Sequence, residues 1–490
     1  MTRFLPGAAA FVAALLVALL GLYANAGTPP PDRGGSSPEP GTVELRLLGV
    51  NDFHGHLEGP RPGVGGAAWL KAHLDRATLP GRTIRVHAGD MIGATPLISS
   101  WFHDEPTMEA GNELAFDVGT LGNHEFDEGG DELIRMLRGG ERTGPGAYRR
   151  DADGRLVNTS SPGYAGARYP YIAANTVDLE GRLRLPPYLV IRRAGVRVGF
   201  IGVTTPSTPK FLLGRYARRF RFTDISDAVN RSVEVLRSQG VRAIVVLAHA
   251  GGPTQDESNA PDFVGEIVDE AREMSSEVDV VIAGHSHSRL DIRVPNPDGS
   301  GDKLIVEALS YGIAFDLVDL TIDRSTGDVV AKSGEVPETS HDIAGDPRVA
   351  ALVERYRRRV APVAIRVLGD AETALTRAGG ELGRLAADAE REYARADAAV
   401  VDAGALRADI DAGPITYAEV SEALAYGHPV MRARLTGTEL QELRARGGYF
   451  SGPADIQPDR TYTVAASQMT MDRGRALGSE ADAVAWYLQR

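Results

Sequence analysis

Five short segments place metal-binding residue types directly after runs of apolar residues. Carboxylate and amide oxygens mixed with imidazole nitrogens suit Mn, Zn, Fe or Co better than Ca. Seven such residues are too many for one tetrahedral ion, but they suit two ions that share a carboxylate. A pair of ions about 3.5 to 4 Å apart can activate a water and hold the oxygens of a phosphoryl group. The residues concerned are Asp52, His54, Asp90, Asn123, His249, His285 and His287.

Each of these residues taken alone has a more ordinary interpretation. An Asp-x-His sequence is usually a solvated turn, and Asn123 after Gly122 is typical of a turn. His249 alone is more often a hydrogen-bonded residue at the end of a strand. The chain has only 11 histidines, however, and four of them fall on these positions. The combination therefore favours one shared site over coincidence.

The apolar runs that precede these residues indicate buried strands. They are rich in Val, Ile and Leu, and each ends in a small or polar turn. Helix-period stretches at 225–239 and 264–274 lie among them, which favours an α/β domain whose sheets are covered by helices. The carboxyl ends of strands are where such sheets collect ligand-binding groups. The runs are VELRLLGV, TIRVHAG, VRVGFIGV, AIVVLAHA and VDVVIAGH.

A change of pattern near Asp346 marks a second unit. Pro347 and the residues after it predict a long helix with proline in its first turn. We expect residues 43–345 to form the first domain, 346–362 a connecting helix, and 363–490 a smaller α/β domain. In this second domain we expect a helix at 382–394 and strands at 398–401 and 461–466.

The composition and the first residues indicate an exported protein. A net charge of −13 disfavours nucleic acid as a partner, and the lack of cysteine excludes disulfides and thiolate metal sites. Residues 1–26 carry Arg3, an apolar run from Gly7 to Leu22 and an Ala-Asn-Ala sequence, as in a signal peptide. The alternative is an uncleaved anchor, but the run is shorter than the roughly 20 residues that span a bilayer. Residues 27–42 predict a Pro-, Gly- and Ser-rich linker. We expect the cell envelope, periplasm or medium of a bacterium, with no stable membrane span after cleavage.

The order of the motifs resembles one known group. Asp52-x-His54, Gly89-Asp90, Gly122-Asn123-His124-Glu125, His249 and Gly284-His285-Ser286-His287 are similar to the five motifs of calcineurin-like metallophosphoesterases. The strings NDFHGHLE and GNHEFD resemble the branch of secreted 5′-nucleotidases, UDP-sugar hydrolases and 2′,3′-cyclic nucleotide phosphodiesterases. The resemblance implies a four-layer α/β/β/α sandwich followed by a 5′-nucleotidase-type domain that selects the substrate, here shortened.

The resemblance also implies a role for each site residue. Asp52, His54 and His287 would hold one divalent ion, Asn123, His249 and His285 the other, and Asp90 would bridge two ions drawn from Mn, Zn, Fe, Co and Mg. His124 and Asp127 would form a catalytic dyad, in which protonated His124 stabilises phosphoryl and leaving-group charge and Asp127 orients the ring. The nucleophile would be a metal-activated water attacking in line. Glu125 is expected to support the site, and His56 and His87 to have no direct role.

The C-terminal half departs from the family at the base-binding loops. Arg384, Asp402, Arg407 and Tyr426 stand where the resemblance implies substrate contacts, and Tyr426 can stack on a base. The expected Gly-Gly-Asp-Gly-aromatic turn after Gln468 is missing. Tyr449, Phe450 and Trp486 are candidates for the missing aromatic, although simple packing is favoured for Tyr449 and Phe450.

These features favour an exported two-metal phosphohydrolase that acts on nucleotides or related small phosphoesters. A second hypothesis keeps the metal centre but takes cyclic nucleotides, UDP-sugars or other phosphoesters. A third is a secreted nucleotide-binding protein with weak catalysis, against which the complete set of ligand types argues.

Overall fold

The computed structural model describes residues 41–144, 147–151, 155–252, 265–446, 448–471 and 473–490. Residues 43–490 form one compact unit. The predicted signal peptide at 1–26 and nearly all of the predicted linker lie outside the described residues. Within the described ranges, no helix is both long and apolar enough to cross a bilayer.

Two six-stranded sheets form the first domain. The first has the order β16 (Val329–Glu335), β15 (Asp316–Asp323), β1 (Thr42–Val50), β2 (Thr83–His87), β3 (Val118–Thr120), β6 (Tyr171–Ile172). The second has the order β13 (Arg289–Pro295), β14 (Asp302–Ala308), β12 (Val280–Ala283), β11 (Ala243–His249), β9 (Val196–Thr204), β8 (Tyr188–Arg193).

The centre of each sheet is parallel, which decides where the site forms. Strands β1, β2, β3 and β6 pair in parallel in the first sheet. Strands β9, β11, β12 and β14 do so in the second. Parallel neighbours end at the same edge, so residues that follow these strands are brought together.

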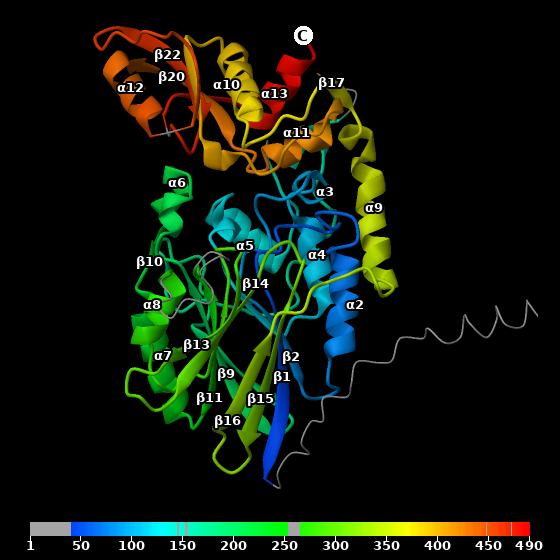
Figure 1. Cartoon of the computed structure of the whole chain (residues 1–490), viewed down its shortest axis with the longest axis vertical. Helices are drawn as coiled ribbons and strands as arrows, with labels where there is room; N and C mark the ends of the chain where they lie inside the picture. The colour runs from blue at the N-terminus through cyan, green and yellow to red at the C-terminus, as the bar shows by residue number, and fades with distance from the viewer. Residues whose placement is uncertain (1–40, 145–146, 152–154, 253–264, 447, 472) are drawn as a thin grey trace, which may run out of the picture. The chain divides into compact units, whose positions relative to one another are not determined.

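Three apolar clusters divide the domain into four layers. One lies between the sheets and joins inward side chains such as Leu45 of β1 to Leu247 of β11. A second joins the other face of the first sheet to helices α2 (Ala67–Ala77), α4 (Glu105–Leu114) and α9 (Pro347–Ala364). A third joins the other face of the second sheet to α7 (Ile225–Ser238) and α8 (Glu266–Glu273). Figure 1 shows these helices on the outer sides of the two sheets. The expected four-layer α/β/β/α sandwich is confirmed.

Smaller elements complete this domain. The helices are α3 (Leu97–Ser100), α5 (Gly130–Arg138) and α6 (Gly214–Ala217), with 3-10 turns η1 (His124–Phe126) and η3 (Thr208–Lys210). The strands β4 (Tyr148–Arg150) and β5 (Leu156–Asn158) form one ribbon, and β7 (Thr176–Asp178) and β10 (Phe220–Phe222) form another.

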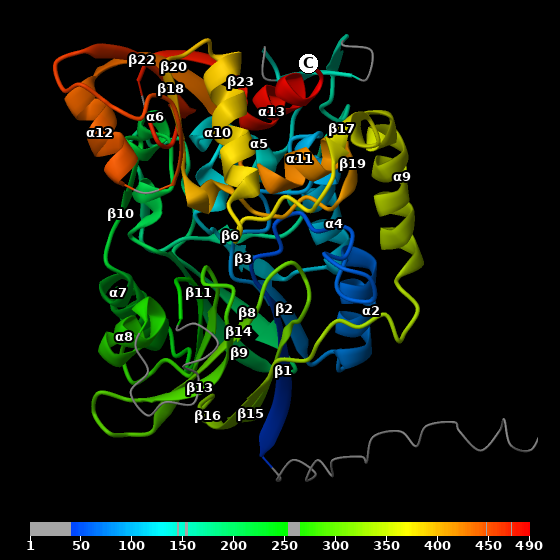
Figure 2. The same ribbon diagram turned by 45° about the horizontal axis from the view of Figure 1, so that its top comes forward.

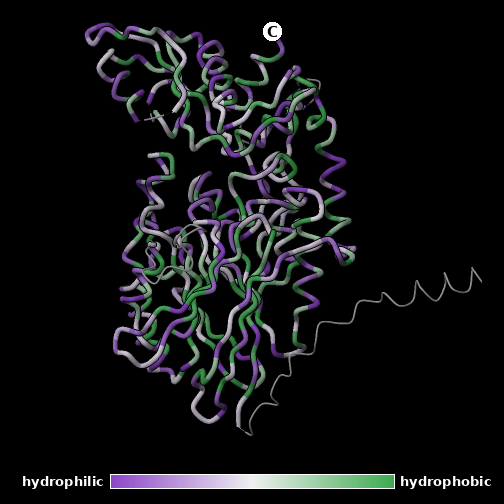
Figure 3. Tube along the Cα trace, in the orientation of Figure 1, coloured by the Kyte–Doolittle hydropathy of each residue, from purple (hydrophilic) through white to green (hydrophobic). Residues whose placement is uncertain are grey.

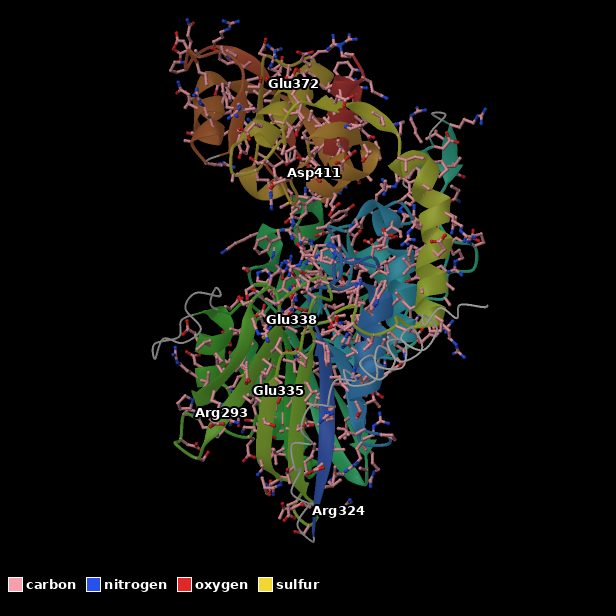
Figure 4. The ribbon with its side chains drawn as sticks, turned by 45° about the vertical axis from the view of Figure 1, so that its right-hand side comes forward. Arg293, Arg324, Glu335, Glu338, Glu372 and Asp411 are labelled. Atoms are coloured by element: carbon pink, nitrogen blue, oxygen red, sulfur yellow. The ribbon has the colours of Figure 1, made fainter. Side chains whose placement is uncertain are left out.

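Hydropathy follows this layering. Apolar stretches run along the strands in the middle of the first domain (Figure 3). Charged side chains on the outer strands and hairpins, such as Arg293, Arg324 and Glu335, are exposed and are labelled in Figure 4. The core therefore lies in and between the sheets, as expected for an α/β protein with covered sheets.

Helix α9 is the long helix expected after Asp346. The Asp346 side chain accepts hydrogen bonds from the backbone N–H groups of Arg348 and Val349, and Pro347 occupies the first turn. Proline fits there because the first N–H groups of a helix have no partner inside it. Val353 and Tyr356 of the same helix pack into the first domain's outer core.

The second domain is built on a five-stranded sheet of order β21 (Tyr449–Ser451), β18 (Ala398–Val401), β22 (Thr461–Ser467), β20 (Pro429–Thr436), β23 (Arg475–Ser479). A two-stranded sheet joins β17 (Val367–Ala371) to β19 (Gly413–Thr416). The helices are α10 (Glu381–Tyr393), α11 (Tyr417–Ala423), α12 (Gly437–Ala445) and α13 (Glu480–Leu488), all visible in Figure 2. The chain thus carries a separate C-terminal α/β domain.

Two buried glutamates meet inside this second domain. Glu390 of α10 and Glu480 of α13 are 0% and 1% exposed, and each carboxyl influences the ionisation of the other. Neither carboxyl has a hydrogen-bond partner among the described side chains and backbone groups. Burial raises the pKa of Glu390 well above its ordinary value and that of Glu480 to about 8. The folded protein therefore favours the protonated pair.

Candidate metal centre and active site

The strand ends bring all seven predicted ligands to one edge of the sandwich. Three groups of ligand types have their nitrogen and oxygen atoms within 4.8 Å of one another. Two of these groups share Asp90 and two share His54, so the three form one continuous cluster. The groups are Asp52 with His54 and His287, His54 with Asp90 and His124, and Asp90 with His249 and His285.

The distances within this cluster are those of ligand atoms that face a common centre. His54 Nε2 lies 3.3 Å from His287 Nε2 and 3.7 Å from Asp90 Oδ2. On the other side of Asp90, the same Oδ2 atom is 3.1 Å from His249 Nε2. His249 Nε2 is also 3.0 Å from Asn123 Oδ1, which adds the amide oxygen to this side.

The imidazoles are held in the tautomer that a metal requires. His54 Nδ1 is 2.8 Å from Gly93 O, and His249 Nδ1 is 2.9 Å from Ala88 O. A carbonyl oxygen only accepts, so each Nδ1 carries the hydrogen and each Nε2 can present a lone pair to the cluster. His54 Nε2 and His287 Nε2 face each other at 3.3 Å, a separation that suits two nitrogens bound to one cation. The donor set therefore fits divalent metal ions.

The charge states of Asp52 and His285 also fit, whereas His249 carries a proton that a metal ion must displace. At His249, burial alone would lower the pKa, but the carboxylate of Asp90 outweighs it and raises the pKa to about 10. Burial alone would raise the pKa of Asp52, but His287 and other neighbours outweigh it and lower the pKa to about 2. Burial lowers the pKa of His285 to about 4, so this imidazole is neutral near pH 7. An ionised carboxylate and a neutral imidazole are the forms in which these side chains bind metals.

The backbone is strained at the predicted ligands. Five of them have positive φ angles, from 44° to 80°, although none is glycine. Such conformations cost of order 1 kcal/mol or more and persist where surrounding structure enforces them. Their concentration here indicates that side-chain placement is fixed before any ligand binds. The five are Asp52, His54, Asp90, His285 and His287.

Glu125 joins two of the loops, as expected for a supporting residue. Its carboxylate accepts hydrogen bonds from the backbone N–H groups of Asp90, Met91 and Gly122. The loops approach so closely that a Cβ at Gly122 would lie 2.1 Å from Asp90 Oδ1. Glycine at position 122 is therefore required for Asp90 to reach the cluster.

Two further buried residues hold the ligand loops, and sequence reasoning missed both. Glu307 accepts hydrogen bonds from Ser286 Oγ at 2.9 Å and from Ser288 N at 3.0 Å, which fixes the loop bearing His285 and His287. Asn51 Nδ2 donates to Asp52 Oδ2 at 2.7 Å. Its Oδ1 accepts from the backbone N–H of Ala308 at 2.9 Å.

His124 and Asp127 form the predicted pair on the turn η1. His124 Nδ1 and Asp127 Oδ2 are 2.6 Å apart, and their side chains are 9% and 14% exposed. Burial alone would lower the pKa of His124, but the carboxylates of Asp127 and Asp90 outweigh it and raise the pKa to about 9. A protonated imidazole with its Nε2–H free is therefore available beside the cluster.

Tyr426 and Arg407 of the second domain contact residues around the cluster. The Tyr426 ring stacks on His124 with centroids 5.5 Å apart. Arg407 donates to Tyr426 Oη at 3.1 Å and to Tyr311 Oη at 3.3 Å. Tyr311 in turn packs edge-on against His287. Tyr311, whose place after β14 follows the pattern of the other strand ends, was not singled out from the sequence.

The other two predicted substrate residues have no such contact. Arg384 is exposed and lies 3.4 Å from Glu381. Asp402 accepts from the backbone N–H of Gly404 at 2.8 Å and so caps a short turn. The structure brings together Arg407 and Tyr426 but shows neither Arg384 nor Asp402 touching the cluster.

His56 and His87 lie near the cluster without joining any of its ligand groups. His56 stacks on Tyr311 with centroids 3.9 Å apart, and its Nδ1 is 3.0 Å from His54 O. His87 is buried among aromatic rings, including Phe116. Both therefore have packing roles in the structure.

The three aromatic residues considered for base stacking make other contacts. Tyr449 Oη donates to Arg377 O at 2.9 Å. Phe450 lies under the guanidinium of Arg444, 4.5 Å from its ring centroid. Trp486 packs against Tyr393. No ring contact joins any of the three to the cluster within the described ranges.

Comparison with protein families defines the class of this chain. Residues 45–289 match the family described as calcineurin-like phosphoesterase. Residues 364–446 match the family described as 5′-nucleotidase, C-terminal domain. With the fold and the buried His/Asp cluster, these matches show that the chain is a phosphoester hydrolase of the calcineurin-like class. Within that class it belongs to the 5′-nucleotidase family.

Individual relatives agree with this assignment. The chain is 34% identical over 473 residues to the endonuclease YhcR of Bacillus subtilis (strain 168), covering 86% of this chain and 36% of that protein. It is 32% identical over 461 residues to the cell wall protein Lmo0130 of Listeria monocytogenes serovar 1/2a, covering 82% and 56%. It thus spans less than two thirds of either relative.

A solved structure supports the fold. The 5′-nucleotidase precursor of Thermus thermophilus superposes with a TM-score of 0.73 at 24% identity, covering 91% of this chain and 96% of that one. The fold of both domains is therefore found in an experimental structure.

Proposed function

We propose that the chain is an exported phosphohydrolase with two divalent metal ions that releases phosphate from 5′-nucleotides. The observation that carries the proposal is the continuous His/Asp cluster around Asp90 with the His124–Asp127 pair at its edge. The family matches support a division into a metal domain at 43–345, a connecting helix at 346–362 and a substrate domain at 363–490.

The proposed ligands follow the three groups of the cluster. Asp52, His54 and His287 hold one ion, Asn123, His249 and His285 hold the other, and Asp90 contributes to both. Divalent ions bound in this way lower the pKa of water and neutralise phosphoryl oxygens. Glu125 and Glu307 keep the ligand loops in place through the hydrogen bonds described above.

The dyad acts on the leaving group in this proposal. Asp127 holds Nδ1 of His124, which turns Nε2–H toward the substrate and favours the imidazolium form. His124 then donates to the ester oxygen as its bond to phosphorus breaks. Tyr426, stacked on His124, and Arg407 contact the nucleoside or its phosphate. Arg384 and Asp402 are proposed as more distant substrate contacts.

Export rests on the signal-like residues 1–26 and on a relative whose name places it in the cell wall. We therefore place the proposed activity in the cell envelope, the periplasm or the medium of a bacterium.

Phosphate release from 5′-AMP tests the proposal. The purified protein is stripped of metal, reloaded with Mn or Zn, and compared with its metal-free form and with His124→Ala. Metal-dependent release that the substitution lowers by at least about 100-fold supports the proposal. Release that persists without metal, or that is unchanged in His124→Ala, contradicts it.

A second candidate is the hydrolysis of phosphodiesters or UDP-sugars at the same metal centre. Two observations favour it: the departure of the base-binding loops, and a relative named as an endonuclease. Comparing rates on 5′-AMP, a 2′,3′-cyclic nucleotide and UDP-glucose separates these substrates.

A further inference from the structure

Phe211 is an exposed aromatic ring beside the metal-ligand cluster. It is 42% exposed and is the only exposed phenylalanine among the described residues. Its ring meets the imidazole of His285 edge-on, with centroids 5.5 Å apart and planes at 72°. Full burial of a phenylalanine side chain contributes about 1.5 to 3 kcal/mol to the free energy of folding. Phe211, as an exposed residue, does not gain this stabilisation.

The turn that carries Phe211 is firmly built. It follows β9, whose last residue Thr204 lies opposite His249 in the parallel pair. Thr205 N donates to His249 O at 2.8 Å, and Thr208 Oγ1 donates to Thr205 O at 2.7 Å. Phe211 N in turn donates to Thr208 O at 3.0 Å. The ring is thus tied by hydrogen bonds to a ligand strand and is placed in advance.

Three tyrosine or phenylalanine rings contact imidazoles of the cluster, and two of them, Tyr311 and Tyr426, are joined by Arg407 into one surface. Tyr426 stacks on His124, whereas Phe211 contacts His285. In the described part of the chain, no ring contact joins Phe211 to Tyr426. A phosphomonoester carries one ester-linked group, here called an arm, and needs one aromatic surface to bind it. A phosphodiester carries two arms.

The segment around Phe211 is also positively charged in an acidic protein. Residues 210–221 contain one lysine and four arginines but no acidic residue. Lys210, Arg215 and Arg218 are exposed, and neither Lys210 nor Arg218 forms an ion pair with any described residue. An exposed aromatic ring in a segment that also carries exposed cations is a combination typical of sites that bind a base and its phosphate.

We infer that Phe211 and its cationic neighbours bind the second arm of a nucleotide phosphodiester. The inference rests on the second candidate function, phosphodiester hydrolysis at the metal centre, and assigns a binding surface to it. The Phe211 ring stacks on the base of the retained arm, while the leaving arm lies on the side of His124 and Tyr426. Water adds its oxygen to phosphorus and gives up a proton to solvent, and the bond to the leaving oxygen breaks. That oxygen gains a proton, so the products are an alcohol and a phosphomonoester.

Three substrates with a common leaving chemistry test the inference. They are a dinucleoside monophosphate, the methyl ester of 5′-AMP and 5′-AMP itself, which differ in whether a second arm is present and whether it bears a base. We compare kcat/KM for the unsubstituted protein, Phe211→Leu and Phe211→Trp. Val330→Ala, which trims another exposed apolar side chain on the distant strand β16, is the matched control.

We expect Phe211→Leu to lower kcat/KM about 10-fold on the dinucleoside monophosphate only, because stacking on one base is lost. Phe211→Trp should retain the activity, and Val330→Ala should match the unsubstituted protein on all three substrates. An equal loss on all three substrates, or no loss on any, overturns the inference.

A binding measurement separates this inference from the proposed function. Titration calorimetry of the dinucleoside monophosphate with the metal-free protein requires no turnover. A Kd about 10-fold weaker for Phe211→Leu supports the inference even if hydrolysis is absent. Equal binding by the two proteins contradicts it even if 5′-AMP is hydrolysed.

Discussion

Replacing Asp127 by asparagine tests the role of the His124–Asp127 pair most directly. The change keeps the size of the side chain but removes the negative charge 2.6 Å from His124 Nδ1. Unit charges about 4 Å apart interact by about 4 kcal/mol at an effective dielectric constant of about 20. Because both side chains are slightly exposed, we discount this to about 3 to 4 kcal/mol, which corresponds to a rate loss of about 100- to 1,000-fold.

The loss should depend on the leaving group. The nucleoside oxygen of 5′-AMP is strongly basic and must be protonated as it departs, whereas the nitrophenolate of p-nitrophenyl phosphate is stable without a proton. We therefore expect the full loss of kcat on 5′-AMP and less than about 10-fold on the aryl ester. Steady-state kinetics on the Mn-loaded proteins measure both.

Glu128→Gln is the control, because Glu128 is a carboxylate on the same turn that pairs with Arg142 instead of His124. It should retain kcat on both substrates to within about threefold. The reasoning is refuted if Asp127→Asn slows both substrates equally, since His124 would then serve something other than leaving-group protonation.

Three further predictions concern metal and pH. Removing the metal with a chelator should abolish hydrolysis and lower Tm by at least about 2 °C, because the ligand atoms that face one another lose their cation. An unchanged Tm in scanning calorimetry contradicts this prediction. Glu307→Ala should weaken metal affinity about 10- to 100-fold, whereas the control Glu335→Ala on the exposed side of β16 should not. Equal metal content of the two variants, measured by mass spectrometry at limiting metal, contradicts the positioning role of Glu307. The pKa of Glu480 is raised to about 8, so between about pH 5 and 8 the folded state keeps a proton that the unfolded state releases. The free energy of unfolding should therefore fall by up to about 1.4 kcal/mol per pH unit over this range. Glu480→Gln, which removes the titrating group, should reduce this dependence in thermal melts, and the exposed Glu442→Gln should leave it unchanged. A flat profile in the unsubstituted protein refutes the idea.

The gathering of the cluster's side chains at one edge could be predicted from the sequence because the rule behind it is local. A short apolar run ends, a polar residue follows, and parallel pairing then carries Asp52, Asp90 and His249 to one edge. The start of α9 could also be predicted, because Asp346 caps the helix and Pro347 favours its first turn. Such signals need only a few neighbouring residues.

The supporting contacts could not be predicted because they join segments that are distant in sequence. Glu307 reaches Ser286 across 21 positions through the pairing of β12 with β14. Phe211 meets His285 only because β11 lies between β9 and β12 and pairs in parallel with both. The sequence around Phe211 is typical of a surface turn. It does not indicate which imidazole the ring contacts.

The bond from Thr205 N to His249 O marks where the chain stops determining the geometry of the cluster. Up to this bond, the register of β9 against β11 fixes the backbone, and an insertion would displace His249. Beyond it, residues 206–213 form an outward turn that contributes no ligand to the cluster. Residues of this turn can therefore be exchanged while the cluster stays intact, and the turn is a practical starting point for redesigning substrate choice.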